Sequence, residues 1–172
     1  MREDASGSAA SYARTARARL VAAYAAYELA DLARTAVPVG AHELCPDGTV
    51  HSPGAVLAEA AQLLRSARQL LEDAAVFERV GGASWQLVGD VLGVSAQSAR
   101  VRFAPAEDLF RQDSDCARGA ASWWSAYLAE APQEAARDLD DWVLRHMDGD
   151  GDGLGAEPVS GGLARRSPKR GS

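Results

Sequence analysis

Gln97 and Arg100 are spaced three residues apart, so on a helix they lie one turn apart on the same face. In the major groove of DNA, a glutamine amide can pair with adenine and an arginine guanidinium with guanine, through two hydrogen bonds each. Arg102 follows closely and offers a positive charge for a backbone phosphate. These residue types at this spacing indicate a helix that can read duplex DNA.

Two serines stand where helices are expected to begin. Ser84 and Ser95 can each accept a hydrogen bond from the free N–H groups in the first turn of a helix. Such helix ends also attract phosphate, because their N–H groups point outward and the helix dipole is positive there. The candidate DNA-contacting residues are therefore Ser84, Gln86, Ser95, Gln97, Ser98, Arg100 and Arg102.

The elements that must position these side chains are two helices joined by a tight turn. Apolar residues recur at helical spacing after Ser84, and Gly93 can adopt the positive φ that closes a helix. Gly89 lies where the two helices would cross, and Val94 is expected to fill the corner between them. Phe103 would anchor the second helix in the core. The pattern predicts a helix-turn-helix unit over residues 81–104.

A family resemblance lies in residues 82–104, in the order Ser84-Trp85, Val88-Gly89, Leu92-Gly93-Val94-Ser95, Gln97, Ala99 and Arg102-Phe103. This order resembles the helix-turn-helix of region 4 of the sigma-70 factors, and the small regulators of high-GC bacteria that share this module. The resemblance implies DNA as partner and residues 95–103 as the recognition helix. Such proteins often carry polar residues near the positions of Arg100 and Val101, whereas Val101 is apolar here.

The rest of the chain also reads as helix, so we predict an all-α fold. Residues 1–8 are expected to be disordered, and residues 9–80 to hold two long helices, over about 9–36 and 53–79. Ser52 and Pro53 would start the second of these. Pro105 is expected to break the chain, and acidic helices to fill residues 105–147: a short one near 106–112, one near 115–129 and a last one from Pro132. The Gly-rich and charged residues 148–172 are predicted to form a disordered tail.

The helix expected over 53–79 carries a wide apolar stripe with a heptad-like period. Its residues seven apart are Val56, Leu63, Leu70 and Phe77, and a second series steps by three and four residues through Leu57, Ala60, Leu64, Ala67, Leu71 and Ala74. This spacing suits pairing of helices between two copies of the chain, and a dimer gains affinity by reading two half-sites. We therefore expect a homodimer. The competing interpretation is that the stripe packs only against the chain's own helices.

The composition and charge of the chain limit the classes of function that it can have. The 172 residues include 47% hydrophobic side chains and a net charge of −6, with acid concentrated in residues 113–153 and a balanced charge over residues 81–112. No apolar run is long enough for a membrane span, and the first residues lack an apolar signal core. We expect a cytoplasmic protein associated with the nucleoid, with its two cysteines reduced.

Four other features have weaker functional interpretations. Asp148–Gly153 resembles the opening of an EF-hand loop, but Val159 stands where the bidentate glutamate belongs. The loop with His42, Cys45 and His51 lacks the spacing of a zinc site. Trp123 and Trp124 fit a core better than a ligand platform, and the basic run 165–170 fits a solubilising tail as well as a phosphate contact. We therefore expect no catalytic residues, no metal and no cofactor, and a protein that is not an enzyme.

The sequence thus favours a DNA-binding protein that acts in transcription regulation or chromosome organisation. The alternative is an adaptor that binds another protein, such as RNA polymerase or a sigma factor, through its acidic C-terminal half. Salt-dependent retention on duplex DNA separates the two hypotheses, because phosphate binding weakens steeply as salt rises.

Overall fold

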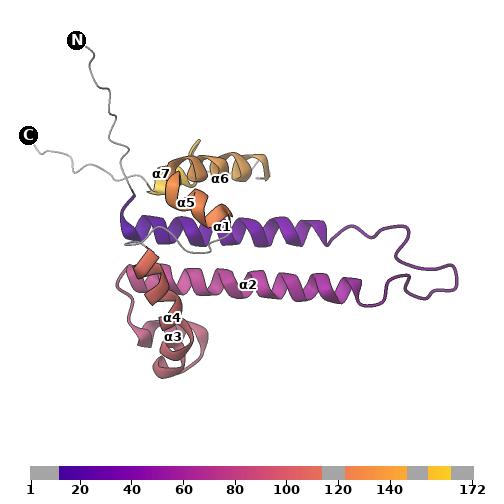
Figure 1. Ribbon diagram of the computed structural model, residues 1–172, viewed down its shortest axis with the longest axis horizontal. Helices are drawn as coiled ribbons and strands as arrows, with labels where there is room; N and C mark the ends of the chain where they lie inside the picture. The colour runs from indigo at the N-terminus through magenta and orange to yellow at the C-terminus, as the bar shows by residue number, and fades with distance from the viewer. Residues whose placement is uncertain (1–11, 114–122, 147–154, 164–172) are drawn as a thin grey trace, which may run out of the picture.

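Two long helices, α1 (Arg14–Thr35) and α2 (Ala55–Val80), lie side by side as an antiparallel hairpin in the computed structural model (Figure 1). The structure describes residues 12–113, 123–146 and 155–163. Within these ranges every regular element is a helix, and the connection between α1 and α2 contains one isolated β-bridge, between Leu44 and Val50. The predicted all-α fold is therefore confirmed.

Smaller helices cover the hairpin on its two opposite sides (Figure 1). Helices α3 (Trp85–Leu92) and α4 (Ala96–Asp113) pack on the α2 side. Helices α5 (Trp123–Glu130), α6 (Pro132–His146) and α7 (Ser160–Leu163) lie on the α1 side. No helix in the described ranges has the length and apolarity needed to cross a membrane.

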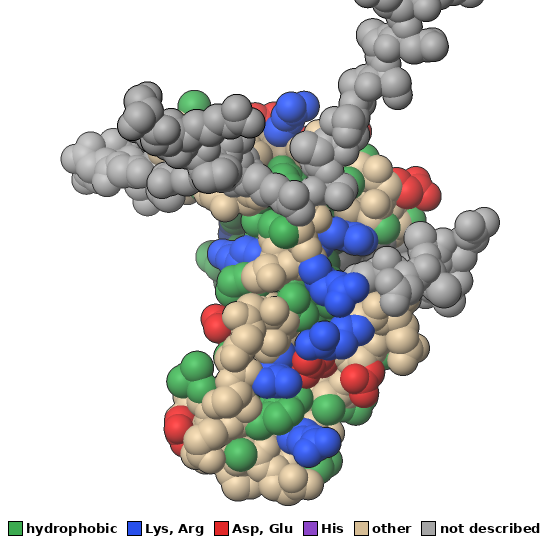
Figure 2. All heavy atoms as spheres, turned by 90° about the vertical axis from the view of Figure 1, so that its left-hand side faces the viewer, with side chains coloured by type: hydrophobic (Ala, Val, Ile, Leu, Met, Phe, Trp, Pro, Cys, Tyr) green, Lys and Arg blue, Asp and Glu red, His purple; other side chains and the backbone are tan. Residues whose placement is uncertain are grey.

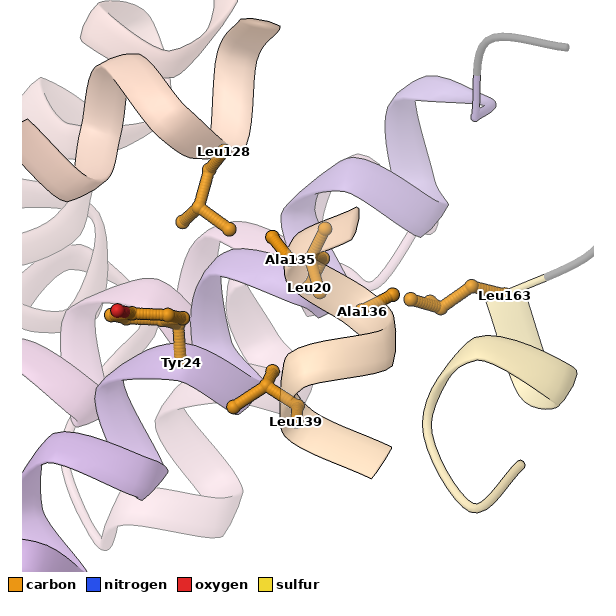
Figure 3. Packing of buried hydrophobic residues seen from close by; sticks show 7 residues of the cluster. All are labelled: Leu20, Tyr24, Leu128, Ala135, Ala136, Leu139 and Leu163. Carbon is orange, nitrogen blue, oxygen red and sulfur yellow. The ribbon is translucent and has the colours of Figure 1, made fainter. Parts of the chain in front are cut away.

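Each side of the hairpin has its own hydrophobic core. The α1–α6 cluster joins Leu20 and Tyr24 of α1 to Leu128, Ala135, Ala136, Leu139 and Leu163 (Figure 3). The α2–α4 cluster consists of Ala75, Val88, Ala99 and Phe103, with Leu71, Trp85 and Leu92 partly buried against it. The hairpin thus lies between two hydrophobic cores, because α1 contributes residues to one of them and α2 contributes residues to the other.

Helix α2 begins later than expected and without the expected cap. Ser52 and Pro53 lie before the helix, and Gly54 occupies the N-cap position with φ 93° and no side-chain capping bond. A turn in which the Ala55 N–H donates to the Ser52 carbonyl takes the place of the serine cap. The predicted start at Pro53 is wrong because the chain turns at Gly54, whose lack of Cβ permits this left-handed conformation.

Pro105 does not break the chain, contrary to expectation. Helix α4 runs continuously from Ala96 to Asp113 with Pro105 inside it. A proline here leaves the Val101 carbonyl without its helical N–H donor. Both Val101 and Pro105 are exposed, so water can satisfy that carbonyl, while the buried Phe103 and Glu107 hold the helix on either side.

Residues 155–163 fold back onto α6, so the prediction of a disordered tail from residue 148 is wrong for this segment. Asp140, which is buried on α6, accepts hydrogen bonds from the Val159 N–H at 2.6 Å, the Ser160 N–H at 3.0 Å and the Ser160 hydroxyl. Leu163 enters the α1–α6 cluster. The remaining parts of the predicted tail, 147–154 and 164–172, and the predicted disordered residues 1–8 lie outside the described residues.

Candidate nucleic-acid interface

Helix α3 has the two ends that its sequence predicts. The Ser84 hydroxyl accepts a hydrogen bond from the Leu87 N–H at 3.1 Å, which caps the first turn. At the other end Gly93 adopts φ 67°, and the Val94 N–H donates to the Gly89 carbonyl at 3.0 Å. This pairing closes the helix in a Schellman arrangement and turns the chain toward α4.

Helix α4 starts only three residues later. The Ser95 hydroxyl oxygen accepts the Ser98 N–H at 3.1 Å and lies 2.8 Å from the Ser98 hydroxyl. The Ser98 N–H is thereby satisfied, whereas the N–H groups of Ala96 and Gln97 belong to the helix's free first turn. The start of α4 is therefore fixed in position and still offers backbone donors.

Gly89 sets how closely the two helices approach. A Cβ added at this residue would lie 2.7 Å from the Val94 carbonyl oxygen and 3.0 Å from the Ala96 nitrogen. These are backbone atoms that cannot rotate away, so only glycine fits. Val94 itself is 44% exposed, so its side chain does not fill the corner as expected. The corner is closed instead by backbone packing on Gly89, with Leu92 partly buried beside it.

Phe103 and Ala99 anchor α4 to the core, as the sequence predicts. Both are almost fully buried, with Phe103 only 1% exposed, and they pack with Val88 of α3 and Ala75 of α2. A ring buried to this degree stabilises a fold by about 3–5 kcal/mol relative to alanine. The opposite face of α4 is held toward solvent as a consequence.

An ion-pair joint locks α4 and the start of α3 to the end of α2. Glu107 is buried between Arg79 of α2, at 3.0 Å, and Arg111 of α4, at 2.7 Å. Arg79 also donates to the Ala83 carbonyl and lies 4.2 Å over the Trp85 ring. Burial alone would raise the pKa of Glu107, but the hydrogen bonds and charges of the two arginines lower it.

Sequence reasoning missed this joint. The four-residue spacing of Glu107 and Arg111 is a readable local signal for a helical ion pair. Arg79 and Glu107 lie 28 residues apart, and no local pattern connects them. The joint matters for the site because it fixes the orientation of α4 relative to the long hairpin.

Six of the seven candidate DNA-contacting residues fall into two groups. Gln97 and Arg100 are exposed on α4, and neither side chain has a hydrogen-bond or ion-pair partner among the described residues. The other polar side chains are engaged locally: Ser84, Ser95 and Ser98 in capping, and Gln86 with Asp90 at 2.7 Å. The structure thus brings Gln97 and Arg100 together as the two polar groups left free.

Arg102 is exposed as well, but its guanidinium carbon lies 4.9 Å from the centre of the Phe103 ring. The side chain therefore follows the helix surface beside the core aromatic residue. Val101 lies between the two arginines in sequence and is 68% exposed. An apolar side chain in such a position can contact the methyl group of thymine.

The other candidate sites receive little support from the described residues. The Cys45 sulfur lies 4.0 Å from Nδ1 of His51, but no group of three or more potential metal ligands is found in the ranges that the structure covers. The EF-hand-like Asp148–Gly153, the side chains of Trp123 and Trp124, and the basic run 165–170 lie outside the described residues.

Comparison of the chain with family models, curated proteins and solved structures gives no match. The function proposed for this pair of helices therefore depends on their own geometry and on the residue types that they expose.

Proposed function

We propose that the protein is a sequence-dependent DNA-binding protein that acts in transcription regulation or chromosome organisation. In this proposal α3, the Gly93 turn and α4 form a helix-turn-helix, and α4 is the recognition helix. One observation carries the proposal: Gln97 and Arg100 are exposed, without partners among the described residues, on a helix whose start, core face and far end are all fixed. A rigid helix that presents free side chains able to form two hydrogen bonds each with a base is suited to base recognition.

The exposed face of α4 combines direct readout with positioning. Arg100 would pair with guanine, Gln97 with adenine, and Val101 would contact a thymine methyl group. Because the Ser95 hydroxyl already serves its own helix, we assign phosphate contact to the backbone N–H groups of Ala96 and Gln97. Arg102 would add a charge from the side of the helix.

The test compares Arg100→Ala with wild-type protein on two duplexes: the tightest site selected from a random library, and a mixed-sequence duplex. We expect the preference for the selected site to fall by about 1–3 kcal/mol, because one bidentate base contact is lost. Arg65→Ala, an exposed arginine on α2, is the matched control and should leave the preference unchanged. Equal discrimination by Arg100→Ala and wild type would refute the assignment of Arg100.

We further propose that the protein works as a homodimer through the exposed part of α2. Leu57 is 74% exposed and Leu64 52% exposed, whereas Leu71, the next residue of the same seven-residue series, packs against the α2–α4 cluster. The chain's own helices therefore leave Leu57 and Leu64 largely uncovered. A second copy is the partner for which the seven-residue spacing is suited.

The adaptor function remains the second candidate, and α6 is the element that supports it. Glu134, Asp138 and Asp141 are exposed on α6 and offer an acidic surface to a basic protein. If the protein is retained on duplex DNA at low salt and this retention is lost as salt rises, the DNA-binding function is supported. Absence of any retention, together with binding to RNA polymerase or a sigma factor, would support the adaptor.

A further inference from the structure

The first turns of α1 carry a concentration of positive charge that the proposed recognition helix does not explain. Residues 12–27 contain Arg14, Arg17 and Arg19 and no acidic residue. Arg14 is exposed and Arg17 partly exposed, and neither side chain has an ion-pair partner among the described residues. In a chain with a net charge of −6, such a segment is available for an anionic partner.

The start of α1 lies directly beside the segment that leads into α3. The Thr15 methyl carbon is 3.8 Å from the position that a Cβ on Gly81 would take, and Gly81 is three residues from the Ser84 cap. Arg19 lies 5.9 Å over the Phe77 ring in the last turns of α2. Residues far apart in sequence thus meet at one end of the molecule.

At this same end the Arg79–Glu107–Arg111 joint adds further positive charge. Two arginines share one carboxylate, and the Arg111 side chain remains 45% exposed. Residues 12–27 and 77–112 together hold seven arginines against four acidic residues. These two segments therefore carry a net positive charge although the whole chain is negative.

Figure 2 looks onto this end and shows basic side chains in a broken row from the upper part of the molecule to its lower tip. The only lysine, Lys169, is not among the described residues, so every basic side chain coloured there is an arginine. Few acidic side chains interrupt the row. The α3–α4 pair forms the lower part of this face, and α1 begins above it (Figure 1).

We infer that Arg14 and Arg17 bind the phosphate backbone of the DNA that flanks the site contacted by α4. This inference rests on the proposed function and extends it from one helix to the start of the long hairpin. Arginine at such a position adds affinity that does not depend on base sequence, because phosphates are the same at every step. It also holds the long hairpin against the duplex and so limits how α4 can enter the groove.

The test measures binding of the full chain to a mixed-sequence duplex and to the selected site over a series of salt concentrations. For Arg14→Gln/Arg17→Gln, the slope of log affinity against log salt should become shallower by about 1–2, since each phosphate contact contributes about 0.9. Affinity at low salt should fall roughly tenfold on both duplexes, while the preference for the selected site stays unchanged.

Two variants serve as controls. Arg34→Gln/Arg65→Gln removes the same charge from exposed arginines away from this end of the hairpin, and should keep the wild-type slope. Arg14→Lys/Arg17→Lys keeps the charge and should retain most of the slope. Because the replaced side chains are at least partly exposed and unpaired, we expect all these variants to fold, which circular dichroism will verify.

The outcomes separate this inference from the proposed function. If the wild-type protein binds DNA, but Arg14→Gln/Arg17→Gln and Arg34→Gln/Arg65→Gln show the same slope of log affinity against log salt, the role of Arg14 and Arg17 is overturned. The proposed function is not affected by that result. Failure of the wild-type protein to bind either duplex at low salt would overturn the proposed function and this inference together.

Discussion

At the scale of single residues, one partly buried carboxylate works against the stability of the fold. Asp73 of α2 faces α1, and its Oδ1 accepts a hydrogen bond from Gln69 at 3.1 Å. Its Oδ2 is buried with no hydrogen-bond partner among the described residues. Burial raises the pKa of Asp73 from 3.8 to about 6; the Gln69 hydrogen bond opposes this shift, and the nearby Glu72 and Glu28 add to it.

The raised pKa makes the contribution of Asp73 to stability depend on pH. The folded state holds the Asp73 proton more tightly than the unfolded state, so this contribution falls as pH rises from about 4 to about 6 and stays lower above that range. Asp73→Asn removes the ionised form. We expect the variant to gain about 1–2 kcal/mol near pH 7, after allowance for partial solvent screening, and nothing near pH 3. Urea unfolding at the two pH values provides the measurement.

The control for Asp73→Asn is Glu59→Gln, an exposed carboxylate on the same helix. It should leave the pH dependence of unfolding unchanged. A gain in stability for Asp73→Asn that is equal at both pH values would show that packing, and not ionisation of Asp73, is responsible.

The residues that sequence reasoning placed correctly all have local signals. Ser84 and Ser95 cap because each is a serine immediately before an apolar helical pattern, and Gly93 closes α3 because the pattern stops there. Gly89 and Phe103 follow from the spacing of the two helices around the turn. Arg79 and Asp73 gave no such signal, since their environment is created by helices remote in sequence.

At the scale of elements, α7 shows why a short segment is hard to predict. Its four residues include two glycines and have too few apolar side chains for a period. The element is held by Asp140 of α6 and by burial of Leu163, both of which depend on tertiary packing. Pro105 is the opposite case, because a strong local signal for a break is overridden by the anchors on both sides of it.

Asp140 should therefore be important for stability. Asp140→Ala leaves the N–H groups of Val159 and Ser160 without their acceptor, so we expect a loss of about 1–3 kcal/mol in the free energy of unfolding. Asp141→Ala changes the exposed neighbouring carboxylate and should have little effect. A chain that ends after His146 should show a loss at least as large as Asp140→Ala, because Leu163 then also leaves the core. Unchanged unfolding of both altered chains would mean that α7 contributes nothing to stability.

At the scale of the whole molecule, the sequence predicts the helices better than their partners. The amphipathic faces of α1, α2 and α6 are readable from apolar spacing, but many pairings would bury them equally well. The structure selects one in which α1 and α2 pack against each other, while α1 also packs against α6 and α2 also packs against α4. This choice leaves one face of the first half of α2 exposed, with Val56, Leu57 and Leu64 on it.

Because one face of the first half of α2 exposes apolar side chains, we expect the chain to form a dimer. Light scattering of the full chain at micromolar concentration should give a mass near twice 18.1 kDa, because paired stripes remove apolar surface from water. Leu57→Glu/Leu64→Glu places charges on the stripe and should shift the mass to that of the monomer. Leu144→Glu alters an exposed leucine on α6 and should leave the dimer intact. A wild-type mass near 18.1 kDa at every concentration would show that the stripe does not pair, and that one copy of α4 meets the DNA alone.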